Sequence, residues 1–560
     1  MRSILLAAGA ILALVACGTV ATEPTPPRGG IVAPEAAGPP LSPAALAQHI
    51  RILSSDEFEG REPASRGERL TTDYISRQFA AAGLQPGWNG QWLQPVPLVE
   101  ASVKGEPVLT ITGADGARTY AYRSQTVLFT KRPSPVINLA NAPLVFVGYG
   151  VNAPELGWND YAGVDMAGKI AVILVNDPDF ETPAGHPTTG KFGGKAMTYY
   201  GRWTYKFEEA GRQGAAGALI IHETGPAAYP WAVVESSWTG PQFDLKRGPE
   251  DKRVEVEGWI QSAVATELFQ RAGLDFAALK AAAQQQGFRA RPMNLGGSIR
   301  LETDVKDSVS NNVIGILPGR EAPGEAFVYG AHWDHLGRCT PIDGDDICNG
   351  ALDNATGTAG LIELARNFSA EGRPRRSVVF VAFTAEEQGL LGSAYYAANP
   401  AIPANKTVAA LNMDGASING PTRDVIVVGY GKSDLEGLLE IQARAQGRTI
   451  RAEENPERGS FYRSDHFNLA KVGIPVLYAS GGLDLVNGGT ERGKALSEAF
   501  IAQRYHKPQD EFDPAWDLTG QQQDLTLFYR VGRTIVDGDT WPNWKPTAEF
   551  YPIRQRSLGR

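Results

Sequence analysis

The sequence predicts an α/β protein with a doubly wound mixed sheet, interrupted by a smaller β-rich insert. In the second half of the chain, short apolar runs alternate with longer segments in which apolar residues recur at helical spacing. The runs are almost uninterrupted, as expected for strands in a sheet that helices cover on both faces. A chain of 560 residues is longer than a single hydrophobic core usually accommodates, so two or more domains are expected.

The N-terminal part of the folded chain is predicted to contain two helices. Ser42 can cap the first helix, with Pro43 in its first turn. Apolar residues at helical spacing predict the second helix over residues 71–82, and Gly83 behind it is a typical stop signal.

The middle of the chain has a different sequence pattern. Apolar runs at residues 144–147 and 170–175 predict buried strands, and a helix is predicted over 205–213. Over roughly residues 140–265 it resembles a protease-associated domain, a small β-rich module inserted in several secreted peptidases. His222 ends an apolar run there, and we expect a buried histidine with satisfied hydrogen bonds rather than a ligand.

The second half of the chain supplies the elements of the main sheet. Strands are predicted at residues 312–317, 326–331, 377–383, 408–413 and 474–478. A helix with one apolar face is predicted over 358–368. This alternation of strand and helix is typical of a doubly wound sheet.

Candidate metal ligands stand where these elements end. His332, the pair Glu386 and Glu387, and Asp414 each follow a predicted strand, and Asp353 precedes the predicted helix. Ligands of open α/β sheets bind outside the carboxyl ends of the strands. We therefore expect these side chains on one rim of one sheet.

The chemistry of this set indicates a metal site. Imidazole and carboxylate ligands together suit zinc, although oxygen-rich sites also accept manganese or cobalt. Two metal ions about 3.5–4 Å apart share a carboxylate, and another carboxylate must stay off the metals to act as a base. The neighbours Glu386 and Glu387 diverge and can divide these roles. Asp334 can accept a hydrogen bond from the imidazole of His332 and fix its tautomer.

Five ordered motifs carry a resemblance to a known family. They are GAHWDH at 330–335, NGALDN at 349–354, TAEE at 384–387, NMD at 412–414 and YHKPQD at 505–510. The segment LSSDEFEGR at 53–61 also resembles the N-terminal signature of that family. The chain is similar to the secreted co-catalytic di-zinc aminopeptidases, a family that includes glutamate carboxypeptidase and the transferrin receptor ectodomain. The resemblance covers nearly the whole mature chain and implies the zinc exopeptidase fold.

The resemblance implies two Zn²⁺ per chain, with Asp353 bridging them. The implied ligands are His332, Asp353 and Asp414 for one ion and Asp353, Glu387 and His506 for the other. Glu386 would act as general base, moving a proton from the zinc-activated water to the leaving amine. Tyr505 would donate a hydrogen bond to the tetrahedral oxyanion, the alternative being an aromatic ring packed beside a ligand.

Further residues have two open interpretations each. Asp465 and His466 match a family segment near the substrate pocket, where they would support the ligands or contact substrate. His335 is either part of the site or an ordinary loop residue. Three basic residues could contact a substrate carboxylate or be surface charges: Lys306, Arg338 and Arg463.

The cysteines and the N-terminus predict an exported protein. Arg2, a short apolar stretch and the sequence LVACG at 14–18 resemble a bacterial lipobox with Cys17 as the lipidated residue; the alternative is an ordinary signal peptide. Location at the outer membrane, in the periplasm or on the cell surface is expected. Cys339 and Cys348 then favour a disulfide at the rim of the pocket over a pair of zinc thiolates.

The predicted organisation follows from these features. It comprises a signal peptide at 1–17, a flexible linker at 18–40, a peptidase domain at 41–140 and 295–540, a protease-associated insert at 141–294 and a tail at 541–560. The net charge of -9 argues against nucleic-acid partners. The expected activity is an aminopeptidase acting on peptides. The alternatives are a carboxypeptidase or dipeptidase of the glutamate carboxypeptidase type, a single-zinc glutaminyl cyclase, and a non-catalytic binding module. The preferred side chain and the oligomeric state are not predicted.

Overall fold

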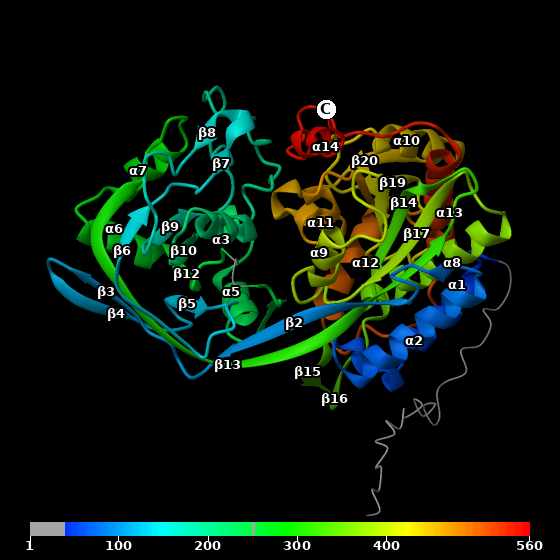
Figure 1. Ribbon diagram of the computed structural model, residues 1–560, viewed down its shortest axis with the longest axis horizontal. Coiled ribbons are helices and arrows are strands. Elements are labelled where there is room, and N and C mark those ends of the chain that lie inside the picture. The colour runs from blue at the N-terminus through cyan, green and yellow to red at the C-terminus, as the bar shows by residue number, and fades with distance from the viewer. Residues whose placement is uncertain (1–39, 249–251, 560) are drawn as a thin grey trace, which may run out of the picture. The chain divides into compact units, whose positions relative to one another are not determined.

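The computed structural model describes residues 40–248 and 252–559 (Figure 1). The predicted signal peptide, with Cys17, and nearly all of the predicted linker lie outside the described residues, so lipidation of Cys17 stays a prediction. Among the residues that the structure describes, no helix is both long enough and apolar enough to cross a bilayer.

A mixed sheet carries the predicted ligands, which confirms the α/β class. Its central strands are β13 (Arg291–Leu317), β17 (Arg376–Phe383), β14 (Ala322–His332), β18 (Thr407–Asn412) and β21 (Val476–Gly481), in that spatial order. The last four are parallel to one another, whereas β13 is antiparallel to β17. The sheet continues through β2 (Leu93–Val103) beside β13, and through β19 (Asp424–Val427) and β20 (Thr449–Ala452) beyond β21.

Helices cover both faces of this sheet because successive side chains of its strands point to opposite sides. On one face, the ring of Phe380 in β17 packs against Phe368 of α8, with centroids 6.1 Å apart. On the other face, Val379 and Val381 of the same strand join an apolar core that includes Phe467 of α11. The helices of the first face are α2 (Arg66–Ala81), α8 (Thr356–Ala370) and α13 (Thr519–Asp537), with α1 (Pro43–Leu53) packed on α8. Those of the second face are α9 (Leu391–Ala398) and α11 (His466–Lys471).

The two N-terminal helices begin at side-chain caps. Ser42 accepts a hydrogen bond from the backbone N–H of Ala45 at 3.2 Å, as predicted for α1. α2 starts earlier than the predicted residue 71, because Ser65 caps it and accepts from the N–H of Glu68 at 3.2 Å. The first turn of α2 is polar, so apolar spacing gave no signal there.

Residues between 109 and 302 build a second sheet with its own apolar core. Its strands are β3 (Leu109–Gly113), β4 (Gly116–Tyr120), β5 (Thr126–Phe129), β6 (Val136–Phe146), β9 (Ile170–Leu174), β10 (Gly217–His222), β12 (Val256–Gln261) and the first half of β13. The structure therefore places residues 109–129 in this sheet, whereas the sequence boundary at 140 grouped them with the ligand-bearing part. The physical reason is that β13 serves both sheets. Its residues up to Glu302 pair with β6, and its residues from Thr303 pair with β2.

The second sheet carries α3 (Trp203–Arg212), which packs on β10. His222, the last residue of β10, is buried, and its Nε2 lies 3.0 Å from the carbonyl oxygen of Tyr229. This confirms the prediction of a buried histidine with a hydrogen-bond partner.

Candidate metal centre

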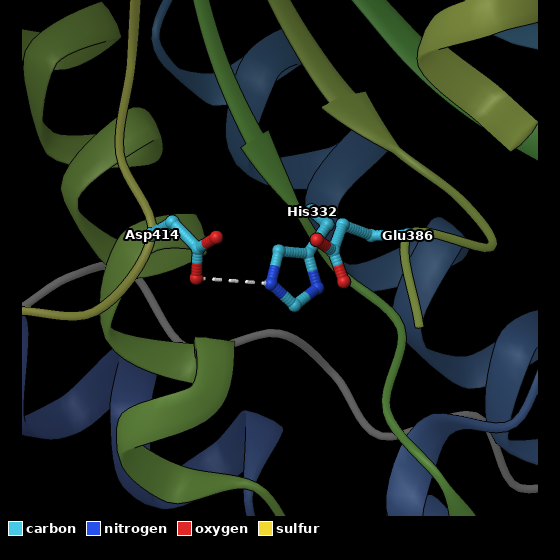
Figure 2. A group of neighbouring side chains, drawn as sticks. All are labelled: His332, Glu386 and Asp414. Atoms are coloured by element: carbon cyan, nitrogen blue, oxygen red, sulfur yellow. Dashed lines mark hydrogen bonds and ion pairs between the residues drawn. The ribbon is translucent and has the colours of Figure 1, made fainter. Parts of the chain in front are cut away.

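The carboxyl ends of β14, β17 and β18 bring the predicted ligands together, as the strand-end argument requires. β14 ends at His332, which is paired in register with Phe383, the last residue of β17. Figure 2 shows the imidazole of His332 between the side chains of Glu386 and Asp414. Its Nε2 lies 3.3 Å from Oδ1 of Asp414. The same Nε2 lies 3.4 Å from Oδ1 of Asp353, which approaches from the loop before α8.

Asp353 faces two histidines at once. Its Oδ1 is directed at His332, while its Oδ2 lies 3.3 Å from Nε2 of His506. Asp510 holds the loop in place, because its carboxylate accepts hydrogen bonds from the backbone N–H groups of Leu352 and Asp353, both at 3.0 Å. The carboxylate of Asp353 is therefore fixed in the middle of the group.

Glu387 completes the second half of the group. Its Oε2 lies 3.2 Å from Nε2 of His506, and its Oε1 lies 2.6 Å from Nδ1 of His335. The shorter distance is that of a strong hydrogen bond. His335, whose role the sequence left open, is thus a buried residue that fixes the orientation of Glu387.

The distances fit a shared cation. Two ligand atoms bound to one tetrahedral zinc at about 2.0–2.1 Å lie roughly 3.3–3.4 Å apart. The four contacts of His332 and His506 with Asp353, Asp414 and Glu387 range from 3.2 to 3.4 Å. The distances of 3.3 and 3.4 Å from Nε2 of His332 to two carboxylate oxygens are long for hydrogen bonds, whereas one cation can bind all three atoms. The residues therefore fit a metal-binding site in which Asp353 faces both histidines.

Negative charge exceeds positive charge at this rim. Burial, with the charges of Asp414 and Glu387, raises the pKa of Glu386 well above its ordinary value. Burial opposes a charged ring at His506, but Glu387 and Asp353 raise its pKa to about 10. A divalent cation would also neutralise these carboxylates, since carboxylates and imidazoles are its usual ligands.

The support of His332 differs from the expected arrangement. Its Nδ1 lies 3.2 Å from the backbone carbonyl oxygen of Asp334, whereas the Asp334 carboxylate is farther away, at 3.7 Å. That carboxylate instead accepts the backbone N–H groups of Glu386 at 3.1 Å and Glu387 at 3.4 Å. Asp334 therefore orients the glutamate pair, and its main chain orients the imidazole.

The remaining predicted residues lie around this group. The ring of Tyr505 stacks on His506, with centroids 3.9 Å apart. Asp465 is buried, and burial raises its pKa to about 7. His466 packs between Phe461 and Tyr478, at centroid distances of 4.6 and 4.8 Å, and burial lowers its pKa to about 3. The structure thus places His466 in aromatic packing, and its contact with a substrate stays a prediction.

Cys339 and Cys348 form a disulfide, the pairing that the sequence favoured. It joins β15 (Gly337–Ile342) to β16 (Asp345–Cys348) in a hairpin that packs on the turn Asp56–Arg61. Gly60 makes this close approach possible, because a Cβ there would lie 2.5 Å from the carbonyl oxygen of Gly337. The hairpin is thereby fixed to the N-terminal signature segment.

Arg61, in the N-terminal motif at 53–61, has a structural role that the sequence does not reveal. Its guanidinium is buried and donates hydrogen bonds to the backbone carbonyls of Leu53, Trp333, Asn349 and Gly350, at 2.6 to 2.8 Å. It therefore ties together the loops that carry His332 and Asp353. The only indication in the sequence was that Arg61 belongs to a short motif, and the motif does not identify the carbonyl groups that Arg61 binds.

Replacing Arg61 by methionine is expected to destabilise the fold by about 3–5 kcal/mol, since four buried carbonyls lose their donors. Urea unfolding of the metal-free protein measures this directly. Arg66→Met, on an exposed side chain, serves as the matched control and should change little. Equal unfolding midpoints for the two variants would contradict the structural role of Arg61.

A pocket of about 730 Å³ opens beside Asp414. Its walls mix apolar and polar groups, and the apolar ones include Leu352, Ile418, Leu483, Phe500 and Trp516. α12 (Gly489–Gln503) forms one wall and leads directly to Tyr505 and His506. The rim thus has a partly apolar cavity next to it, large enough for an amino-acid side chain.

Parts of this chain are similar to known proteins. Residues 312–529 match the family described as peptidase family M28. A probable zinc metalloprotease of Pyrenophora tritici-repentis is 37% identical over 239 residues, which cover 41% of this chain and 51% of that protein. The aminopeptidase NAALADL1 of Mus musculus is 36% identical over 110 residues, covering 17% of this chain and 13% of that protein. The chain thus spans at most about half the length of these curated relatives. The structure of an aminopeptidase from Aneurinibacillus sp. strain AM-1 aligns with a TM-score of 0.47 and 20% identity, covering 88% of this chain and 93% of that one.

Proposed function

We propose, from the premise that residues 312–529 form a domain of peptidase family M28, that this chain is a metal-dependent exopeptidase that removes N-terminal residues from peptides. One observation carries the proposal. Two histidines face the two oxygens of Asp353 at 3.3 and 3.4 Å, the separation of neighbouring ligands on zinc. A carboxylate held in this way between two imidazoles suits hydrolysis assisted by two metal ions.

The residues divide into two ligand sets. His332, Asp353 and Asp414 would hold one Zn²⁺, and Asp353, Glu387 and His506 the other. Zinc supplies a Lewis acid and makes hydroxide available at neutral pH. His335 and Asp334 keep the glutamate pair oriented, and the hydroxyl of Ser464 donates a hydrogen bond to Oδ2 of Asp414 at 2.6 Å.

Glu386 has the properties of a general base. Its side chain borders the same group as His332 and Asp414, and no hydrogen bond from His335 or His506 engages it as one engages Glu387. Its raised pKa favours holding the proton that it takes from water until the leaving amine accepts it. Tyr505, stacked on His506, would donate its hydroxyl to the oxyanion that forms at the cleaved carbonyl.

Removal of metal tests the proposal. Purified protein loaded with zinc should release single N-terminal residues from a peptide library, as read by mass spectrometry. Treatment with a chelator should abolish the cleavage, and added zinc should restore it, because the proposed ligands are held by other protein groups such as His335, Asp334 and Asp510. Cleavage that persists after complete metal removal would contradict a metal-dependent mechanism, and release of residues from the other end would contradict an aminopeptidase.

A further inference from the structure

Two buried charges stand behind the pocket beside Asp414, and the proposed chemistry does not use them. They are Asp524, in α13, and Arg448, which directly precedes β20. A terminal guanidinium nitrogen of Arg448 lies 2.8 Å from Oδ1 of Asp524. Neither residue lines the pocket, so neither would touch a side chain bound there. Replacing such a pair by apolar residues often costs a protein little, so stability alone does not account for it.

Asp524 joins two walls of the pocket. Its Oδ2 accepts a hydrogen bond from the hydroxyl of Ser417 at 2.6 Å and another from the backbone N–H of Gly481 at 2.9 Å. Ser417 belongs to the loop that follows Asp414, and Gly481 is the last residue of β21. Both residues line the pocket. One carboxylate oxygen therefore fixes the separation of these two walls.

Arg448 extends the same network further along both walls. Its guanidinium donates to the hydroxyl of Thr422 at 2.7 Å and to the backbone carbonyl oxygen of Asp424 at 2.9 Å. That carbonyl oxygen also accepts the backbone N–H of Gly482 at 3.0 Å. Thr422 and Gly482 line the pocket as well. The ion pair thus holds residues on both sides of the cavity from behind.

The close packing of these groups depends on the absence of a side chain at Gly481. A Cβ at this position would lie 2.1 Å from Oγ of Ser417 and 2.9 Å from Oδ2 of Asp524. Both separations are far inside van der Waals contact, so any larger residue would push the hydroxyl away from the carboxylate. The wall is therefore shaped around the contact between Ser417 and Asp524.

A different side chain holds the metal ligand in the same loop. Nδ2 of Asn354 donates to the carbonyl oxygen of Met413 at 3.0 Å, and its Oδ1 accepts the backbone N–H of Gly415 at 3.0 Å. These contacts flank Asp414 on both sides, whereas Asp524 binds the loop three residues beyond it. The position of the metal ligand and the position of the pocket wall are thus fixed by separate groups.

We propose that Asp524 and Arg448 are positioning residues that set the width of the pocket and thereby select the side chain of the residue that is removed. This inference rests on the proposed exopeptidase function. A wall held by a rigid network keeps the cavity preformed, so a large apolar side chain binds in it at little cost in ordering. The methyl group of alanine fills little of the cavity and gains little from this rigidity.

The main test is an apolar double variant, Asp524→Leu with Arg448→Met, in the zinc-loaded full chain. Because both charges are replaced, no unpaired buried ion remains and the fold should persist. Ser417 and Gly481 lose their common acceptor, so the wall is no longer held. We expect kcat/KM for the tripeptide Leu-Ala-Ala to fall roughly tenfold to a hundredfold, mainly through KM, as for lost hydrogen bonds to a charged group. The value for Ala-Ala-Ala should fall much less.

Zinc content measured on the same samples separates the pocket from the metal centre. It should stay at the wild-type level in the apolar double variant, because Asn354 still holds the residues on either side of Asp414. Loss of zinc together with activity would place Asp524 and Arg448 in support of the metal ligand and would overturn their assignment to the pocket.

Two further variants make the result specific. Asp524→Asn with Arg448→Gln also removes both charges but keeps a carbonyl acceptor for the wall, so it should retain most of the preference for leucine. Glu325→Gln removes the acidic partner, at 2.7 Å, of another buried arginine, Arg376, and is the matched control. It should leave the ratio of the two kcat/KM values unchanged, since a general loss of stability lowers the active fraction for both peptides alike.

Ser417→Ala keeps the test decisive if the apolar double variant does not fold, because it removes only the hydroxyl that Asp524 binds. It should shift the ratio in the same direction by a smaller factor. Equal kcat/KM for the two peptides in the wild type would overturn this inference and leave the exopeptidase proposal standing. An unchanged ratio in the folded double variant, or in Ser417→Ala where only that variant folds, would do the same. If the wild type cleaved neither peptide, both proposals would fail.

Discussion

Replacing Glu386 by alanine is expected to lower kcat by roughly 10²–10⁴-fold while the metal content stays unchanged. The side chain borders His332 and Asp414, yet it is the one carboxylate of the pair that His335 and His506 leave free. Without it, the proposed transfer of a proton from water to the leaving amine loses its carrier. Steady-state kinetics on an aminoacyl-p-nitroanilide, together with metal analysis of the same sample, measures both quantities.

Two variants make this result specific to Glu386. Glu321→Ala removes a carboxylate that is 57% exposed and pairs only with nearby arginines, and it should leave kcat unchanged. Glu387→Ala removes a ligand, so its activity should fall together with its zinc content. If Glu386→Ala lost zinc as Glu387→Ala does, Glu386 would be a ligand rather than the base.

Replacing Asp353 by alanine is expected to have the largest effect of any single change at the site. Its two oxygens face His332 and His506, so both proposed metal sites would lose a ligand at the same time. Turnover should fall further than for loss of one acid–base group, which is worth about 10²–10⁴-fold. Zinc retained after gel filtration, measured by mass spectrometry, should drop well below one ion per chain.

The comparison with His506→Ala isolates the bridging role. That variant removes a ligand of one ion only and should retain about one zinc per chain, since the other ligand set is intact. Asp343→Ala, at the tip of the disulfide-linked hairpin, is the control for loss of a carboxylate. An Asp353→Ala protein that still held two zinc ions would rule out a shared carboxylate at this position.

Much of the fold was predictable because local patterns and the tertiary structure agree. The continuous apolar runs became β14, β17, β18 and β21, and every residue of β17 and β18 is buried. The start of the first helix was predictable from Ser42, whose side chain caps the helix by accepting the backbone N–H of Ala45. The start of α2 was missed because its first turn is polar and gives no apolar periodicity, although Ser65 and Glu68 have the spacing of a capping box. The extent of β13 was not predictable, because a strand shared by two sheets leaves no periodic signal.

The class of chemistry could be predicted from the sequence, because local patterns predict the strands and the carboxyl ends of parallel strands meet at one edge of a sheet. The residues that stand at these ends are His332, Asp353, Glu386, Glu387 and Asp414. Tertiary structure alone decided how these groups are supported. Asp334 turned out to hold the glutamate pair through backbone N–H groups, and Arg61 to join loops far apart in the chain. Hydrogen bonds and charges act over a few ångströms in space, whereas sequence patterns report only neighbours along the chain.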